Sequence, residues 1–466
     1  MRKKAVHFIG IGGTGLSAIA RLLLESGYQV SGSDRQMSPL AHELQAAGAR
    51  VVIGHYPENV AGADLVIRSS AIPDEHIEVQ AAKNAGIPVL KRAEFLPQLL
   101  AGKRTIAVAG THGKTTATAM IAWLLSAMGL DPSFIVGGVI ENLAVNARAG
   151  NSSIFVIEAD EYDRMFLGIE PEIALVTNVE FDHPDCFPTP EDFYRSFFEF
   201  AHKITPGHGK LIACAEDKGS SQLLREMKKE RIALSYGFTP IENDFALDYH
   251  GESLTKNQMG CYTFTMMKKD HPLTDVCLSI PGRHNALNAL GALAVLDSLE
   301  LPVEQGAEFI KQFRGAGRRF EIQGEVNGVV FIDDYAHHPT EIKVTLAAVK
   351  DRFPTRRLIV VWQPHTYSRV LALWDDFANA FSAADLVVVT NVYAARELAP
   401  EKFSMAEQVK SVHHDQAYYQ DSLQEASNFL VNILKPGDVL LVCSAGDANK
   451  INQTVQRALK IKGKVV

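Results

Sequence analysis

The sequence predicts an α/β protein built from three consecutive domains, and three observations favour this fold class. Residues 5–9 form a short apolar run that leads into glycines, and residues 105–109 repeat this pattern before a second glycine-containing loop. Apolar runs of strand length alternate with helical patterns along the chain, which is typical of parallel sheets covered by helices. At 466 residues the chain has room for about three domains of ordinary size.

Two polar stretches are the candidate boundaries between these domains. The first is Ala101-Gly-Lys-Arg104, and the second is rich in glycine, asparagine and charged residues near 314–328. The domains are therefore expected at residues 1–103, 104–318 and 319–466.

The first domain begins with a pattern typical of a nucleotide-binding βαβ unit. A strand is expected at 5–9, a helix at 16–26 and a second strand at 28–34. The loop Gly10-Ile-Gly-Gly-Thr-Gly15 between the first two satisfies G-x-G-x-x-G, and Asp34 ends the second strand. In the dinucleotide fingerprint such a loop approaches a diphosphate and the acidic residue holds a ribose. We therefore expect a nucleotide diphosphate here, against the alternative of a structural tight turn.

The second domain begins with a phosphate-binding loop of unusual spacing. A strand at 105–109 runs into Gly110-Thr-His-Gly-Lys-Thr-Thr116, and a helix is expected from about 115 to 128. A standard P-loop carries a glycine five residues before the glycine of Gly-Lys-Ser/Thr, where this chain has Val108. Even so, the backbone N–H groups, the Lys114 charge and the Thr115 hydroxyl suit a nucleotide triphosphate with Mg²⁺.

Polar residues follow two further strands expected in this domain, at 154–157 and 173–177. Because ligands of open α/β sheets bind at the carboxyl ends of strands, Glu158, Asp160 and Asn178 are candidates for chemistry. Carboxylates are suitable Mg²⁺ ligands, whereas His183 alone is more typical of a hydrogen-bonded structural residue.

The third domain shows a further αβ series, with strands expected at 358–362, 386–390 and 439–442. Three polar clusters lie before or within it. Each also has a simpler structural interpretation, which is, in chain order, a helix cap, a solvated charge pair and a polar loop. They are Gly282-Arg-His-Asn285, Arg318-Arg319 and Asp333-Asp-Tyr-Ala-His-His-Pro-Thr-Glu341.

The composition of the chain indicates which cellular compartment and which classes of partner to expect. The net charge is -8 and no basic run occurs, which argues against a nucleic-acid surface. No apolar run reaches the roughly 18 residues of a membrane helix. The five cysteines show no metal-ligand spacing and suggest buried thiols in a reducing compartment. We expect a cytoplasmic protein without a nucleic-acid or membrane partner, as a monomer or homodimer.

Taken together, these motifs resemble the Mur ligases, the ATP-dependent amide-forming enzymes of bacterial peptidoglycan synthesis. The shortened loop at 110–116 is the family's form, and the likeness covers nearly the whole chain. It extends through Glu158-Ala-Asp-Glu161, Thr177-Asn178, Asp182-His183, Gly282-Arg-His-Asn285, Gly317-Arg-Arg-Phe320, Asp334-Tyr-Ala-His-His-Pro-Thr-Glu341 and Gln363-Pro-His365.

The resemblance implies which residues bind each reactant. UDP-N-acetylmuramate and L-alanine would be the substrates, joined through an acyl phosphate, with ATP and Mg²⁺ as cofactors. The UDP-sugar would contact Gly12, Gly13, Thr14, Gly15, Asp34, Ser69 and Ser70. ATP would contact Gly110, Thr111, His112, Gly113, Lys114, Thr115, Thr116, Asn178, His284, Asn285, Arg319 and Asp334. Metal ions would be held by Thr115, Glu158 and His183. The amino acid and the reacting carboxylate would be surrounded by Tyr335, His337, His365 and Arg369. The catalytic residues would be Lys114, His183, His337 and Arg369.

The acceptor is the open point of the resemblance. The first loop, with Gly32-Ser-Asp34 and Ser69-Ser-Ala-Ile72, is most similar to the L-alanine-adding branch. That branch usually carries arginine, glycine and glycine where this chain has Thr366, Arg396 and Ser444. Glu161-Tyr-Asp163 and Glu180-Phe-Asp-His183 are more similar to the ligase that attaches a recycled murein tripeptide to the same sugar.

Two functions outside the ligases are alternatives. A nicotinamide oxidoreductase explains the first loop and Asp34, but leaves the second loop without a role. A P-loop ATPase that acts as a switch explains the second domain alone.

Overall fold

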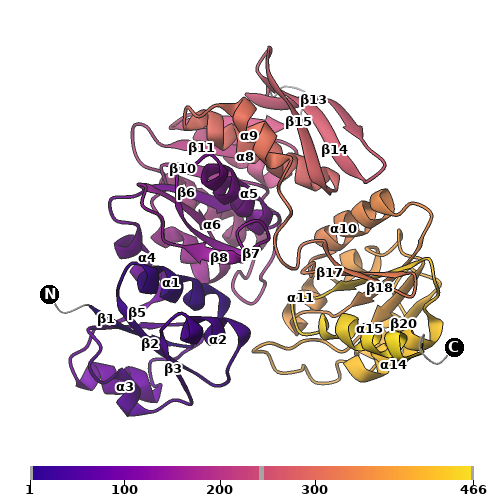
Figure 1. Cartoon of the computed structure of the whole chain (residues 1–466), viewed down its shortest axis with the longest axis horizontal. Coiled ribbons are helices and arrows are strands. Elements are labelled where there is room, and N and C mark those ends of the chain that lie inside the picture. Colours follow the sequence, from indigo (N-terminus) through magenta and orange to yellow (C-terminus); the bar gives the residue numbers. More distant parts are fainter. Residues whose placement is uncertain (1–3, 241–245, 463–466) are drawn as a thin grey trace. The chain divides into compact units, whose positions relative to one another are not determined.

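Three sheets follow one another along the chain in the computed structural model, which describes residues 4–240 and 246–462 (Figure 1). The chain divides into two compact units. The first contains residues 1–180, 194–250 and 290–309, and the second contains residues 181–193, 251–289 and 310–466. The predicted α/β class with three successive sheets is confirmed, while the boundaries at 103/104 and 318/319 stay a prediction.

The first sheet is fully parallel, in the order β3-β2-β1-β4-β5. Its strands are β1 Ala5–Ile9, β2 Gln29–Asp34, β3 Arg50–Ile53, β4 Leu65–Arg68 and β5 Val89–Lys91. Its helices are α1 Thr14–Glu25, α2 Pro39–Ala46, η1 Pro57–Val60, α3 Ile77–Asn84 and α4 Arg92–Leu100. The predicted strand 5–9 is β1, which lies at the centre of the sheet and is buried from Val6 to Ile9, so its residues are apolar except for His7.

The second sheet places the ATP-type loop at its centre. From β13 to the edge strand β8 its order is β13-β12-β11-β10-β6-β9-β7-β8, and two further strands, described below, continue it beyond β13. The strands are β6 Arg104–Ala109, β7 Ser133–Ile140, β8 Val145–Arg148, β9 Ile154–Glu158, β10 Ile173–Val176, β11 Lys210–Cys214, β12 Ile232–Gly237 and β13 Tyr249–Lys256. The helices of this region are α5 Lys114–Ala127, η2 Tyr162–Gly168, α6 Pro190–His202, α7 Lys218–Met227, α8 Arg283–Ser298 and α9 Val303–Ile310. Because β9 and β10 flank β6 in parallel, the residues after all three strands meet at one edge.

An antiparallel extension follows that the sequence did not predict. β13 continues past residue 250 into the second unit, where β14 Cys261–Lys268 pairs antiparallel with β15 His271–Pro281. Exposed and buried positions mix along these strands, so no continuous apolar run marks them.

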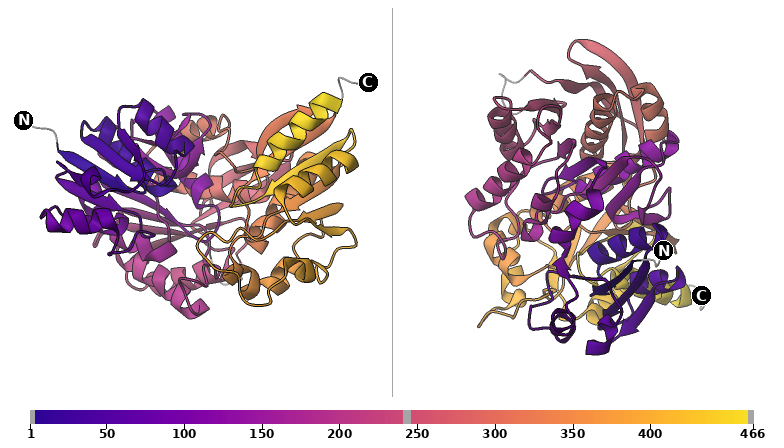
Figure 2. Two further views of the ribbon diagram at one scale, coloured as in Figure 1. Left: turned by 90° about the horizontal axis from the view of Figure 1, so that it is seen from below. Right: turned by 90° about the vertical axis from the view of Figure 1, so that its left-hand side faces the viewer.

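The third sheet has the order β16-β17-β21-β18-β19-β20. Its strands are β16 Glu321–Val326, β17 Val329–Asp334, β18 Arg357–Trp362, β19 Leu386–Val389, β20 Ala417–Tyr419 and β21 Asp438–Cys443. Its helices are α10 Pro339–Arg352, α11 Tyr367–Ala372, α12 Trp374–Ala378, α13 Met405–Val409, α14 Leu423–Ile433 and α15 Lys450–Lys462. One core packs under α10 to α13 and another under α14 and α15, which lie side by side on the opposite face (Figures 1 and 2).

Across residues 4–240 and 246–462, the structure contains no helix of the length and apolarity that crossing a membrane requires. Three of the five cysteines, Cys214, Cys261 and Cys443, are buried as expected, whereas Cys186 and Cys277 are partly exposed.

Candidate functional site

The loop between β6 and α5 is tied to the end of β10. Gly110 has φ +137, and a Cβ atom there would lie 2.1 Å from Thr177 Oγ1, so no larger residue fits. Gly113, at φ 80, is the N-cap of α5. The Asn178 side chain accepts the His112 backbone N–H at 2.8 Å and donates to the His112 carbonyl at 3.1 Å. The predicted loop residues and Asn178 are therefore brought together.

Lys114 is folded into this loop as a largely buried ammonium, with 13% of its side chain exposed. Its Nζ donates to Gly110 O at 2.6 Å, to Thr111 O at 3.1 Å and to Glu161 Oε1 at 2.8 Å. Burial alone would lower the pKa of Lys114, but the carboxylates of Glu161, Asp160 and Glu158 outweigh it and raise that pKa. The lysine is thus positively charged before any phosphate arrives.

Thr115 and Glu158, two of the three predicted metal ligands, are in direct contact. Thr115 Oγ1 donates to Glu158 Oε1 at 2.9 Å, and Glu158 Oε2 accepts the Gly137 N–H at 2.6 Å. A hydroxyl and a carboxylate are hard oxygen donors, so this pair fits Mg²⁺ beside a nucleotide. His183 belongs to the second unit.

The first glycine loop is hydrogen-bonded to the end of β2. The Gly10 and Ile11 N–H groups donate to Ser33 O, and the Gly12 N–H donates to Asp34 Oδ2 at 2.8 Å. A Cβ atom on Gly12 would lie 2.6 Å from Ser38 Oγ. Ser69, of the predicted pair Ser69-Ser70, lies beside Gly10. The predicted loop residues, Asp34 and Ser69 thus surround one place, with the Asp34 carboxylate hydrogen-bonded to the loop itself.

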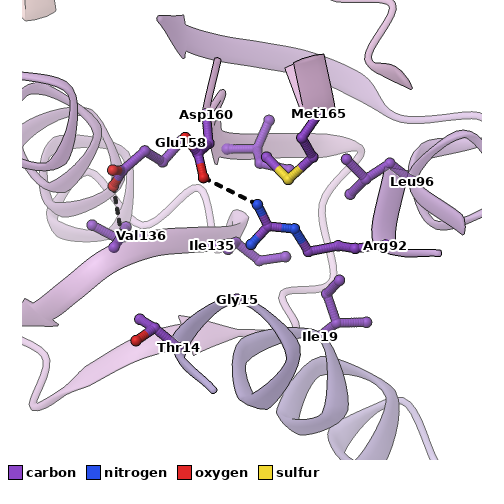
Figure 3. Close-up of a pocket in the computed structure, with 12 residues that line it drawn as sticks. Thr14, Gly15, Ile19, Arg92, Leu96, Ile135, Val136, Glu158, Asp160 and Met165 are labelled. Carbon is purple, nitrogen blue, oxygen red and sulfur yellow. Dashed lines mark hydrogen bonds and ion pairs between the residues drawn. The ribbon is translucent and has the colours of Figure 1, made fainter. Parts of the chain in front are cut away.

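A cavity of about 130 Å³ lies between the start of α1, the middle of β7 and the end of β9 (Figure 3). Thr14 and Gly15 line one side, and Glu158 and Asp160 line the other. Arg92, at the start of α4, donates from Nη2 to Asp160 Oδ2 at 3.1 Å. The cavity therefore joins the first loop to the acidic end of β9 within one compact unit.

In the second unit, Arg369 is the centre of a buried cluster. Its guanidinium donates to both Asp182 oxygens, at 2.7 and 3.2 Å, and to His365 Nδ1 at 3.0 Å. It also approaches His183 Nδ1 at 3.3 Å. Because arginine only donates, both histidine Nδ1 atoms accept. Arg369 is 2% exposed, so as a clamp for an amino-acid carboxylate it would have to release Asp182.

His337 and Tyr335 lie next to this cluster. The His337 and His365 ring centroids are 5.8 Å apart, and those of His337 and Tyr335 are 5.5 Å apart. His337 Nδ1 is 2.9 Å from Tyr335 O, which fixes its proton on Nδ1 and leaves Nε2 as the acceptor. Burial is the main cause that lowers the pKa of His337 to about 3, although Glu341 opposes it.

The predicted ATP contacts in this unit form a second group. Asp334 accepts the Phe320 and Ala336 N–H groups, each at 2.7 Å, and burial raises its pKa to about 6. Arg319 lies over the Tyr335 ring at 5.1 Å. Asn285 donates to Pro281 O at 2.7 Å, and burial lowers the pKa of His284 to about 4. The Asp334 carboxylate therefore secures the chain at Phe320, where the third sheet begins.

Three charged residues that contact these groups were not assigned a role from the sequence: Arg92, Glu161 and Asp182. Each pairs with a residue at least 47 positions away, namely Asp160, Lys114 and Arg369. Local motifs contained two of them, Glu161 in Glu158-Ala-Asp-Glu161 and Asp182 in Asp182-His183, whereas no motif contained Arg92.

Comparison with known proteins identifies relatives of the whole chain. Family models match over residues 5–104 (Mur ligase family, catalytic domain), 108–296 (Mur ligase middle domain) and 318–446 (Mur ligase, glutamate ligase domain). A UDP-N-acetylmuramate--L-alanine ligase of Geobacter sp. (strain M21) is 41% identical over 458 residues, which cover 98% of this chain and 97% of the relative.

Two solved structures are similar over almost their full length. One is a UDP-N-acetylmuramate-alanine ligase from Thermotoga maritima, with a TM-score of 0.81, 28% identity and full coverage of both chains. The other is a murein peptide ligase from Psychrobacter arcticus 273-4, with a TM-score of 0.73, 26% identity and 98% coverage of both chains.

We expect Gly110→Ala to destabilise the protein by about 1–3 kcal/mol, because the new Cβ meets Thr177 and the backbone is left-handed. Thermal unfolding and ATP binding by calorimetry measure the effect. Gly129→Ala is the matched control, since Gly129 also has positive φ but nothing lies within 4 Å of its Cβ position. Equal loss in both variants would show that the contact with Thr177 is not restrictive.

Proposed function

The chain belongs to the Mur ligase family, and from this premise we propose that it joins L-alanine to the lactyl carboxylate of UDP-N-acetylmuramate, with consumption of ATP, in peptidoglycan precursor synthesis. The observation that carries the proposal is the likeness to a relative of that name over 98% of the chain. The similarity to the murein peptide ligase is lower in both TM-score and identity, so the tripeptide is the less favoured acceptor.

The chemistry requires activation, because an amine does not displace oxygen from a carboxylate at neutral pH. The lactyl carboxylate oxygen attacks the γ-phosphorus of ATP, which releases ADP and gives an acyl phosphate. The alanine nitrogen then attacks the acyl carbon, and phosphate leaves. We assign Lys114 to the charge that develops during phosphoryl transfer, a role supported by its position in the loop and its raised pKa.

Mg²⁺ would neutralise phosphate charge when bound. We assign Thr115 and Glu158 as ligands, supported by their contact at 2.9 Å, and His183 as a ligand of a second ion, supported by the family resemblance. For the adenine nucleotide we assign the loop 110–116 with Asn178, and His284, Asn285, Arg319 and Asp334 from the second unit.

The UDP-sugar is assigned to the first glycine loop with Asp34, Ser69 and Ser70. The cavity supports this assignment, because it leads from Thr14 and Gly15 to Glu158. A sugar whose diphosphate lies on the loop would extend along it towards the phosphate-binding loop. This path would carry the lactyl carboxylate to the γ-phosphate.

We assign Tyr335, His337, His365 and Arg369 to the amino acid and the reacting carboxylate. A histidine with a pKa of about 3 is neutral at pH 7 but binds a proton weakly. His337 is therefore suited to accept a hydrogen bond from the amine through Nε2 and to position it. It is poorly suited to remove and keep the amine's proton.

The three sheets support functional divisions at 1–103, 104–318 and 319–466. A cytoplasmic location follows from the proposed substrates, since ATP and UDP-linked sugars are intracellular metabolites.

The acceptor screen tests the proposed function. With UDP-N-acetylmuramate, ATP and Mg²⁺ present, we expect kcat/KM for L-alanine to exceed that for L-Ala-γ-D-Glu-meso-diaminopimelate by about 100-fold or more. L-Serine and glycine serve as size controls, and phosphate release is the readout. Preference for the tripeptide would contradict the L-alanine assignment and identify the protein as the ligase that attaches the recycled tripeptide.

Lys114→Ala is expected to lower kcat by about 10²–10³-fold, because one preorganised charge is lost from the transition state. Lys229→Ala, at an exposed position of the same unit, is the control and should retain full turnover. Near-normal kcat in a folded Lys114→Ala protein would contradict the ATP assignment.

His337→Gln is expected to reduce kcat/KM while leaving the shape of its pH profile between pH 6 and 9 unchanged. The pKa of about 3 lies below that window, so the group neither gains nor loses a proton there. A limb of the profile that disappears in the variant would identify His337 as the titrating base instead.

A further inference from the structure

We propose that Asp160 is a positioning residue for the UDP-sugar, because it holds the Arg92 guanidinium against the first glycine loop, where Arg92 reaches the diphosphate. This inference rests on the proposed function and adds two residues to it. Asp160 follows β9 of the second sheet, whereas Arg92 and the loop belong to the first. Asp160, Arg92 and the loop all lie in one compact unit.

The contact between Arg92 and the loop is unusually close. A Cβ atom on Gly15 would lie 1.7 Å from Arg92 Nη1 and 2.8 Å from its Cζ, so the guanidinium rests directly on the Gly15 backbone. The other terminal nitrogen, Nη2, donates to Asp160 Oδ2 at 3.1 Å. One guanidinium therefore bridges the two sheets, and the last glycine of G-x-G-x-x-G is the residue that makes room for it.

The electrostatics of this place favour an anion. α1 begins at Thr14 and has Gly13 as its N-cap, so no side chain caps its first N–H groups. The first turn of α1, all of which the structure describes, contains no acidic residue. A cation at the positive end of a helix dipole is unfavourable unless negative charge lies nearby. Asp160 supplies that charge in the free protein. A diphosphate on the loop would add further negative charge. Arg92 would then donate from Nη1 to a phosphate oxygen while Nη2 keeps its hydrogen bond to Asp160.

Asp160 is itself held firmly. Its Oδ1 accepts the Tyr162 N–H at 3.1 Å, and its backbone carbonyl accepts the Phe166 N–H at 3.0 Å. Two left-handed residues, Asp163 and Arg164, turn the chain immediately afterwards. A carboxylate fixed in this way can orient a long, flexible arginine side chain, which is 26% exposed.

The position of Asp160 also connects the two substrate loops. The next residue, Glu161, pairs with Lys114 of the ATP-type loop at 2.8 Å. Two consecutive carboxylates thus hold one cation each, Asp160 the cation of the sugar loop and Glu161 that of the ATP loop. Loss of Asp160 should accordingly weaken UDP-sugar binding most and change ATP binding little, because Lys114 keeps its direct hydrogen bond to Glu161.

A double-mutant cycle on Arg92→Lys and Asp160→Asn tests the proposal. Calorimetry would measure Kd for UDP-N-acetylmuramate and, separately, for a non-hydrolysable ATP analogue with Mg²⁺. We expect each single variant to bind the UDP-sugar about 10- to 100-fold more weakly and the ATP analogue within about twofold of wild type. Because both changes break one bridge, the double variant should be no weaker than the weaker single variant.

Asp163→Asn, an exposed position of the same segment, is the matched control and should bind both ligands normally. Thermal unfolding verifies that each variant is folded. Wild-type affinity of Asp160→Asn for the UDP-sugar, or fully additive losses in the double variant, would overturn the inference alone. Absence of UDP-sugar binding by the wild-type protein, with ATP still bound, would overturn the proposed function together with it.

Discussion

The largely buried ion pair between Lys114 and Glu161 is the interaction on which the nucleotide-binding edge of the second sheet depends. Enclosure of the ammonium by its own loop lowers the pKa of Lys114, and the carboxylate of Glu161 within hydrogen-bonding distance is the main group that raises it again. Glu161 provides that carboxylate only because β9 lies beside β6 in parallel register, which brings the residues after β9 to the loop after β6. In a chain of net charge -8, phosphate must be met by such local cations. The positive charge of the loop therefore depends on the strand order, because the order β6-β9 is what brings Glu161 to Lys114.

Much of this fold could be predicted from the sequence, because buried parallel strands leave apolar runs that are easily recognised. The strand expected at 154–157 is β9, Ile154–Glu158, and the helix expected from about 115 is α5, Lys114–Ala127. β14 and β15 were missed because an antiparallel ribbon with partly exposed faces carries no such run. The glycine loops could be recognised in the sequence because they are local motifs. The role of Arg92 could not be recognised, since its partner Asp160 is 68 residues away and only the tertiary structure brings the two together.

The three departures from the family pattern have different structural settings. Ser444 is fully buried, and its hydroxyl donates to Gln363 Oε1 at 2.7 Å and accepts the Gly446 N–H at 2.9 Å. A glycine could make neither bond, so the serine is integrated into its loop. Thr366 precedes α11 with φ 61, in the left-handed region. Arg396 is exposed on the segment after β19. All three lie outside the strands and helices of the third sheet: Arg396 is exposed to solvent, Thr366 lies at the start of α11, and Ser444 is buried within its own loop.

The bridge through Arg92 bears on how this architecture can be recombined. Three family models divide the chain at about residues 104 and 318, which suggests three exchangeable cassettes. The first sheet nevertheless shares one compact unit with strands β6 to β12 of the second, and the Glu25 carboxylate accepts the Ala149 N–H at 2.8 Å as a second link between the two sheets. A chimaera that grafts the first cassette onto a foreign middle cassette would inherit an arginine without its aspartate. Genetic exchange within such a protein is constrained by paired charges, and the smallest unit that can be transplanted intact is larger than the sequence boundaries indicate.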